Sequence, residues 1–314
     1  MMFRRFFWLV LVILMFWNFA QAKPEVKAGV KAGEAKGSQD ADQQINDFSL
    51  SGYGEKGKKS WDLNGKTADI FDDVIKLKNI KGNLFSEQEH VILLADQGDF
   101  NKADGKVHLQ ENVVITTSSG AKLTTDTLDW DRKNQLVTTP DVVNIEKENM
   151  TTVATGAKGQ PNLNKFTLEK DVTVKIKSAL EESKQAMDLM SKNQVIITCD
   201  GPLEVDYQHN VATFNNNVTA DKGDAVIYCD TMDIYFNNTK DKSAPKSAKP
   251  QTTALSGNKI DKIIAKGNVK IVKGENVSYS DEALYTADDQ KIVLKGKPKL
   301  VIYSTADFKQ AFGN

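Results

Sequence analysis

The sequence contains few of the residues that carry catalytic or metal chemistry. Only three of its 314 residues are histidine and two are cysteine. The histidines, His90, His108 and His209, lack the close spacing to other ligands that a zinc site requires. The sequence also has no Gly-rich phosphate loop followed by Lys, no Gly-x-Ser-x-Gly elbow and no Cys/His nucleophile pair. We therefore expect no cofactor, no metal ion and no enzymatic activity.

An excess of charge of one sign is missing too. The chain has 41 Lys and Arg against 42 Asp and Glu, a net charge of −1. A nucleic-acid-binding protein normally shows a basic excess or a basic stripe, so nucleic acid is excluded as the expected partner. Charges of both signs are interspersed among apolar residues, which is typical of the solvated face of a sheet.

Carboxylates are plentiful but form no recognisable site. The segment 99–105 resembles a calcium loop, but its glycine falls one position late, Ala103 occupies a ligand position and the closing Glu is missing. We interpret it as a turn. Four aspartates recur at one place in a repeated unit, which indicates a turn or strand-break role: Asp96, Asp126, Asp230 and Asp281. A glycosidase-type carboxylate pair among them is the enzymatic alternative.

The N-terminus has the pattern of an export signal. Arg4 and Arg5 precede an apolar run, residues 6–17, and small residues at the signal peptidase positions end at Ala22. The run is short for a bilayer span, which takes about 20 residues. Residues 1–22 are therefore either a signal peptide cleaved after Ala22 or a retained single-span inner-membrane anchor. In both cases the rest of the chain is expected in the periplasm.

A strand-turn-strand unit recurs along the chain, at residues 106–130, 212–234 and 265–285. Each copy has an Asn-Val step in its first strand, a glycine turn, and an aspartate in its second strand before a pair of apolar residues. Recurrence at this scale indicates repeated supersecondary structure. Strand signals between these copies extend the same pattern, so the expected fold class is all-β.

Composition divides the chain into segments. Two strand-rich domains are expected, joined by a stretch of helix-forming composition that is either a short helix or a charged connector. The predicted segments are a flexible tether at 23–47, a first domain at 48–177, the connector at 178–193, a second domain at 194–304 with an inserted loop at 238–258, and a tail at 305–314.

One face of these strands is apolar, and no amphipathic helix is available to cover it. The sheet must then fold over or coil, which predicts a sandwich or a jelly roll. The apolar residues are either only a core, as in a structural or adhesive β-repeat protein, or the lining of a lipid groove, where each buried CH₂ contributes about 0.8 kcal/mol. The candidate lining residues are Leu109, Val113, Ile115, Leu123, Leu128, Trp130, Phe214, Val218, Val226, Met232, Ile234, Val269, Ile271 and Tyr285.

The two cysteines, Cys199 and Cys229, are both followed by Asp and lie about one repeat apart. In an oxidising compartment, cysteines in matching register on neighbouring strands can form a disulfide. Two small buried thiols on an inward face are the equal alternative.

The pattern of strand, Asn-Val, Gly turn, Asp and apolar pair resembles the OstA-like β-jellyroll of the lipopolysaccharide-transport proteins. Residues 48–176, with the segments 109–115 (Leu-Gln-Glu-Asn-Val-Val-Ile) and 138–145 (Thr-Thr-Pro-Asp-Val-Val-Asn-Ile), resemble LptC. Residues 194–303, with 201–207 (Gly-Pro-Leu-Glu-Val-Asp-Tyr) and 264–271 (Ile-Ala-Lys-Gly-Asn-Val-Lys-Ile), resemble LptA. The chain thus resembles an LptC-like domain fused to an LptA-like domain.

The resemblance implies two tandem jellyrolls in a periplasmic conduit. It also implies that lipopolysaccharide or a similar glycolipid passes through the apolar groove, driven by an inner-membrane ABC transporter complex. Other OstA-like jellyroll proteins are the implied partners, and they would stack through edge strands. Because LptC-like and LptA-like parts are usually separate proteins, the fusion leaves open whether a separate bridge protein is used.

Overall fold

The computed structural model describes residues 41–53, 57–85, 90–118, 120–131, 133–134, 136–160, 163, 165–177, 194–237, 254–255, 258–289 and 291–303. The predicted signal or anchor at 1–22, the connector at 178–193 and the tail at 305–314 lie outside these residues. Most of the predicted tether and most of the loop at 238–258 also lie outside them. The description below concerns the described residues alone.

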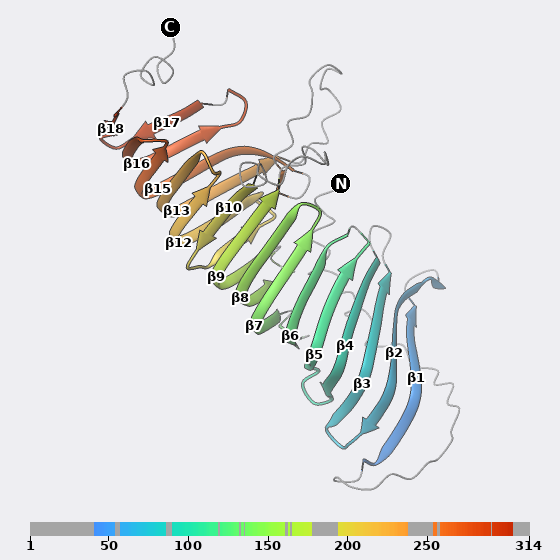
Figure 1. Ribbon diagram of the computed structural model, residues 1–314. Coiled ribbons are helices and arrows are strands. Elements are labelled where there is room, and N and C mark those ends of the chain that lie inside the picture. The colour runs from blue at the N-terminus through green and yellow to red at the C-terminus, as the bar shows by residue number, and fades with distance from the viewer. Residues whose placement is uncertain are drawn as a thin grey trace, which may run out of the picture. The chain divides into compact units, whose positions relative to one another are not determined.

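The fold is all-β, as predicted (Figure 1). The strands are β1 (Gln43–Tyr53), β2 (Lys59–Ile70), β3 (Val74–Phe85), β4 (His90–Asn101), β5 (Val107–Thr117), β6 (Lys122–Asp131), β7 (Leu136–Lys147), β8 (Met150–Gln160) and β9 (Lys165–Lys177). They continue with β10 (Gln194–Cys199), β11 (Leu203–Asp206), β12 (Val211–Asp221), β13 (Ala225–Asn237), β14 (Ala254–Leu255), β15 (Asn258–Lys273), β16 (Asn276–Thr286), β17 (Lys291–Lys295) and β18 (Lys299–Val301). In this part of the chain no helix has the length and hydropathy to cross a bilayer.

The chain forms two compact units, which we call the N-terminal and C-terminal units. The N-terminal unit spans Arg4–Ile145 and Gly156–Asn164, and the C-terminal unit includes Glu146–Thr155 and Lys165–Asn314. The first therefore contains β1–β6 and the second β9–β18, while β7 and β8 contribute residues to both.

The N-terminal unit is an antiparallel meander. Each strand from β1 to β6 pairs with the next one along the chain. The predicted turn at Gly120 joins β5 to β6, and its φ of 84° is one that glycine adopts without strain. β1 begins at Gln43, a few residues before Phe48, where order was expected to start. These polar residues are ordered because their backbone pairs with β2 from Gln43 opposite Ile70 onward.

The C-terminal unit is also antiparallel, with two split strands. β10 and β11 both pair with β9 on one side and with β12 on the other. β12 then pairs with β13, β13 with β15, and β15 with β16. At the end of the unit, β17 and β18 both pair with β16.

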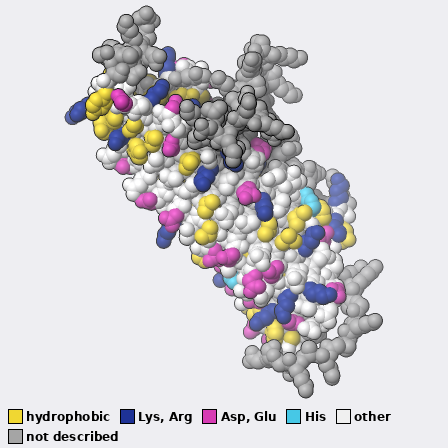
Figure 2. Space-filling model, in the orientation of Figure 1, with side chains coloured by type: hydrophobic (Ala, Val, Ile, Leu, Met, Phe, Trp, Pro, Cys, Tyr) yellow, Lys and Arg dark blue, Asp and Glu magenta, His cyan; other side chains and the backbone are white. Residues whose placement is uncertain are grey.

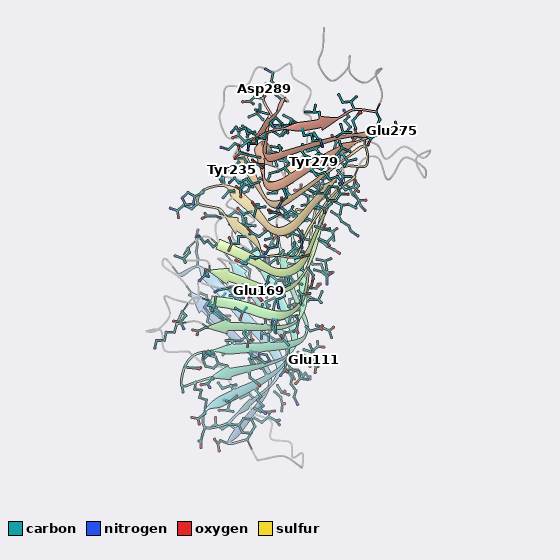
Figure 3. The ribbon with its side chains drawn as sticks, turned by 90° about the vertical axis from the view of Figure 1, so that its left-hand side faces the viewer. Glu111, Glu169, Tyr235, Glu275, Tyr279 and Asp289 are labelled. Carbon is teal, nitrogen blue, oxygen red and sulfur yellow. The ribbon has the colours of Figure 1, made fainter. Side chains whose placement is uncertain are left out.

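Each repeated unit contains a bend in the middle of its strands. In β5 the register with β6 shifts between Gln110 and Val113, where Glu111 (φ 64°) and Asn112 (φ 53°) are left-handed. These two residues lie opposite the single residue Asp126 on β6, so β5 has one extra residue, a bulge that redirects the strand. Figure 3 shows the strands curving, with Glu111 at the bend of β5.

The same bulge occurs at the other two copies of the Asn-Val step. β12 has Asn216 and Asn217 at φ values of 64° and 52°, and β15 has Gly267 and Asn268 at 74° and 49°. Gly and Asn tolerate the left-handed region better than other residues, which explains their recurrence there. The Asn-Val step of the repeat therefore marks a bend within a strand.

The recurring aspartates do not break strands, contrary to our prediction. Asp96, Asp126, Asp230 and Asp281 all lie inside strands, and three Asp–Asn hydrogen bonds form across the bends. Asn112 Nδ2 donates to Asp96 at 2.6 Å, Asn217 Nδ2 to Asp200 at 2.5 Å and Asn268 Nδ2 to Asp230 at 2.9 Å. A carboxylate on the neighbouring strand, or directly after it at Asp200, thus holds the left-handed asparagine in place.

Candidate functional site

The predicted lining residues, with one exception, point to the inner side of the bent strands. Those that are at least nine-tenths buried are Leu109, Val113, Ile115, Leu123, Leu128, Phe214, Val218, Met232, Ile234 and Val269. Trp130, Ile271 and Tyr285 are half-buried on the same face. The assignment rests on the cross-strand register, which places Leu109 opposite Leu128 and Ile234 opposite Ile263.

Val226 is the exception. It lies two residues before Tyr228, which is 41% exposed, and alternate residues of a strand share a face. The inward position belongs to Ile227, which pairs with Ala220 on β12 and Ile271 on β15. Val226 was assigned inward because the alternation of inward and outward residues was assumed to continue unchanged along β13. The bulge at the bend shifts that alternation.

Two rows of side chains flank the bend inside the C-terminal unit. One row runs from Phe214 to Met232, Ala265 and Ala283 across successive strands. The other includes Val218 opposite Cys229, and Val269 opposite Ser280. All of these residues are buried. Along the first row the side chains become smaller, from phenylalanine to alanine. The side chains on the inner side of the bend therefore fill less space at β15 and β16 than at β12.

Beyond β16 the inward face becomes exposed. Ile292 on β17 pairs with Tyr285 and is 54% exposed, and Leu300 on β18 pairs with Ser278 and is 48% exposed. Figure 2 shows apolar side chains at the surface over β16 and β18. Among the described residues, then, the apolar interior of this unit continues to a solvent-exposed end.

The interior of the N-terminal unit is filled differently. Gly98 on β4 pairs with Leu77 and Leu109, both on the inward face. A Cβ at Gly98 would lie 2.6 Å from Ile80 Cδ1 and 2.9 Å from Leu109 Cδ2, so neighbouring side chains already occupy its space. A Cβ at Gly65 would meet the ring of Phe48 in the same way. Adjacent side chains thus cover Gly65 and Gly98.

The outer face carries ion pairs. Lys266 Nζ lies 2.9 Å from Asp233 on the neighbouring strand, and Lys295 Nζ lies 2.7 Å from Glu282. The hydrogen bond to Asp233 raises the pKa of Lys266. Exposed pairs of this kind contribute little stability, at most about 1 kcal/mol each. Their role is to keep this face in water while the other face is apolar.

The histidines do not form a site. His108 Nδ1 lies 2.7 Å from Asp129 and His209 Nδ1 lies 3.0 Å from Asp206, and both pairs are exposed. His90 stacks on Phe85 with ring centroids 4.8 Å apart. Within the described ranges no three potential ligands come close enough to hold a metal ion.

The segment 99–105 contains the last residues of β4 and the turn that leads to β5. The side-chain oxygen of Asn101 accepts backbone hydrogen bonds from Ala103 at 2.9 Å and Asp104 at 3.3 Å, and Asp104 accepts one from Lys106 at 3.0 Å. These oxygens stabilise the turn itself.

Cys199 and Cys229 are free and buried. They do not lie on neighbouring strands, because β12 pairs with both β10 and β13 and separates them. Two strand spacings amount to about 9–10 Å, and a disulfide needs Cα atoms within about 7 Å. Burial raises the pKa of both thiols, that of Cys229 to about 12, so they stay protonated.

Several interior residues were missed by the sequence reasoning. Ser280 is 8% exposed on the inward face, and its Oγ has no hydrogen-bond partner within the described part of the chain. A serine between Tyr279 and Asp281 reads as part of an outer polar face, so no sequence signal identified it. Ala265 and Ala283 were also missed, although they follow the predicted alternation.

These features define a class of protein: an all-β protein of bent antiparallel strands with an apolar inward face. Residues 7–177 match the family model described as lipopolysaccharide-assembly, LptC-related. Residues 201–311 match the model described as the LptA/(LptD N-terminal domain) LPS transport protein. The chain belongs to the LptC-related lipopolysaccharide-assembly family, with an LptA-like part after it, as the sequence resemblance predicted. Among curated proteins none matches the chain significantly.

Proposed function

We propose that the chain is a non-enzymatic lipid conduit. In this proposal it passes lipopolysaccharide or a similar glycolipid from an inner-membrane ABC transporter complex toward the outer membrane. The acyl chains travel along the apolar inward face and the polar head stays in water. Each methylene removed from water contributes about 0.8 kcal/mol, so binding needs no catalytic group.

The observation that carries the proposal is the exposed inward face at the end of the C-terminal unit. Ile292 and Leu300 face inward yet are 54% and 48% exposed. A packed core would cover apolar residues of this size, because full burial of such a side chain contributes about 1.5–3 kcal/mol and these two are only about half buried. An acyl chain that enters at this end would cover them.

Photocrosslinking tests the proposal with a matched pair on β15. Ile263 faces inward opposite Ile234 and Tyr285, whereas Ile264 faces outward opposite Asp233 and Leu284. Both residues are isoleucines of intermediate exposure, adjacent on one strand. A probe at Ile263 is expected to trap glycolipid in cells and a probe at Ile264 is not. Equal labelling at the two positions would contradict the proposal.

A structural or adhesive β-repeat protein is the second candidate. The filled glycine positions of the N-terminal unit, Gly65 and Gly98, favour a packed interior there. This candidate predicts that purified protein carries no lipid and that inward probes in both units trap nothing. Lipid extraction followed by mass spectrometry distinguishes the two and also identifies the lipid.

We further propose that the chain stacks with other OstA-like jellyroll proteins through its terminal strands. β17 is short, and Val293 on it is 46% exposed. A crosslinking probe at Val293 is expected to trap a partner roll, whereas a probe at Thr124 on β6, a strand that lies between β5 and β7, is not. Trapping at both positions, or at neither, would count against edge pairing.

Periplasmic localisation rests on the N-terminal sequence. Residues 1–22 direct export in this proposal, and they are either removed after Ala22 or retained as an inner-membrane anchor. N-terminal sequencing of the mature protein decides between the two. The two domains proposed from the sequence, 48–177 and 194–304, can be tested by limited proteolysis, which should cut first within 178–193.

A further inference from the structure

Ser280 presents a hydroxyl to an otherwise apolar interior. It lies on β16 opposite Val269, which is 1% exposed, and is itself 8% exposed. Its Oγ is buried and has no hydrogen-bond partner among the residues that the structure describes. A buried hydroxyl without a partner is unfavourable, and buried polar groups in native proteins are normally paired. The position therefore calls for a polar group that this part of the chain does not supply.

The surroundings of Ser280 have small side chains. Ala283 lies three residues along the same strand, on the other side of the bend, and pairs with Ala265. On β12 and β13 the corresponding places are taken by Phe214 and Met232. The interior residues next out from the bend on β16, Ser278 and Tyr285, are half-buried. A guest that displaces the Tyr285 side chain can reach the inner side of the bend at Ser280.

Building on the conduit function proposed above, we propose that Ser280 binds the hydroxyl of a hydroxylated acyl chain. The serine hydroxyl can both donate and accept a hydrogen bond, and so can a hydroxyl on the guest. The residues beside it on β15 and across the bend, Val269, Ala265 and Ala283, are apolar and suit methylenes. A chain without the hydroxyl fits the same space but leaves Ser280 unpaired, so the site discriminates between the two.

The geometry also says which part of the guest is recognised. A charged carboxylate or phosphate is unfavourable in an apolar interior and stays in water. The hydroxyl that reaches Ser280 is therefore one carried on the acyl chain, away from the charged end. Ser280 is in this view a specificity-determining residue of the conduit.

The test compares dodecanoate with 3-hydroxydodecanoate as probes, both below their micelle concentrations, by calorimetric titration of the full chain. The wild-type protein is expected to bind the hydroxylated acid about fivefold more tightly, the size of one net hydrogen bond. Ser280→Ala should bind both acids equally. Ser278→Ala is the matched control, because Ser278 lies on the same strand and face but pairs with Ile271 in the next row. It should keep the preference.

Each outcome is informative. Binding of both acids without preference, or a preference that survives Ser280→Ala, would overturn the role of Ser280 and leave the conduit proposal intact. Failure of the wild type to bind either acid would count against the conduit itself. Ser280→Cys keeps the volume of the side chain but weakens its hydrogen bond, so it should reduce the preference even if the alanine variant proves unstable.

Discussion

The bend in β5 makes a prediction in which neighbouring substitutions have opposite signs. Asn112 is exposed, left-handed at φ 53°, and donates to Asp96 at 2.6 Å. Glu111 beside it is left-handed at φ 64° and exposed, and at the equivalent places the chain has Asn216 and Gly267. Asn112 therefore suits its conformation, whereas Glu111 is strained in it.

The magnitudes follow from two separate effects. A left-handed conformation is unfavourable by about 1–2 kcal/mol for an ordinary L residue, and a hydrogen bond contributes about 1 kcal/mol. Asn112→Ala loses both and should lower the free energy of unfolding by about 2 kcal/mol. Asn112→Gly removes the hydrogen bond, but glycine adopts the left-handed conformation without strain, so the free energy of unfolding should fall by about 1 kcal/mol. Glu111→Gly relieves strain and should stabilise by about 0.5–1 kcal/mol.

The assay is urea unfolding of the full chain, followed by tryptophan fluorescence. Of the four tryptophans, Trp61 and Trp130 lie on β2 and β6 in the N-terminal unit, and Trp8 and Trp17 lie within residues 1–22, so the same measurement on a chain that begins at residue 23 reports on the unit that contains the bend. A double-mutant cycle of Asn112→Ala with Asp96→Ala isolates the hydrogen bond, and its coupling should be about 1 kcal/mol.

Two results would refute this reasoning. If Asn112→Gly were no more stable than Asn112→Ala, the left-handed backbone would not be what selects asparagine. If Glu111→Gly were clearly destabilising, the bend would not be strained at Glu111. A coupling near zero would instead remove only the hydrogen bond from the explanation.

Three further predictions concern other parts of the chain. Gly267→Ala should destabilise the protein by about 2–4 kcal/mol more than Gly274→Ala. Both glycines are left-handed, but a Cβ at Gly267 overlaps the Asp230 carboxylate, whereas one at Gly274 meets nothing within 4 Å. Equal urea midpoints for the two variants would contradict this. Burial alone would raise the pKa of Asp62, but hydrogen bonds from Asn83 at 2.6 Å and Lys59 at 3.1 Å outweigh burial and lower that pKa. The ionised Asp62 therefore stabilises the folded protein above the unfolded pKa of about 3.9. This contribution is lost as the pH falls through the folded pKa. Thermal unfolding between pH 6 and pH 2 should therefore show a smaller acid loss for Asp62→Asn than for the wild type, and parallel curves would argue against it. Native protein at pH 8 should leave both cysteines unlabelled by iodoacetamide while unfolded protein labels both, since burial raises both thiol pKa values; rapid native labelling would mean that the interior is open at Cys199 or Cys229.

The sequence predicts the elements better than it predicts their shape. The glycine turns at Gly120, Gly223 and Gly274 and the strands on either side follow from period-two alternation and turn residues. The bend was not recognised, because an asparagine inside a strand pattern reads as a surface residue. Its signature was nevertheless present, since Asn or Gly recurs before the Val in all three copies.

The inward face was predictable only as far as the alternation was intact. Most lining residues, such as Val113 and Phe214, lie on the face that simple alternation gives them. Val226 does not, because the bulge at the bend shifts the alternation between the two arms of a strand. Ser280 was unpredictable for a different reason, since polarity in a strand normally indicates the outer face.

The bend and the apolar interior are parts of one arrangement. Because strands such as β5, β12 and β15 bend, each of them contributes one arm to either wall of the interior. The size of the side chains beside the bend can then vary from strand to strand without changing the fold. In the C-terminal unit this size falls from Phe214 to Ala283, and the inward face ends exposed at Ile292. In the N-terminal unit adjacent side chains cover Gly65 and Gly98. One backbone plan thus supports a filled interior and a more open one, and the residues at the bend decide which of them a unit has.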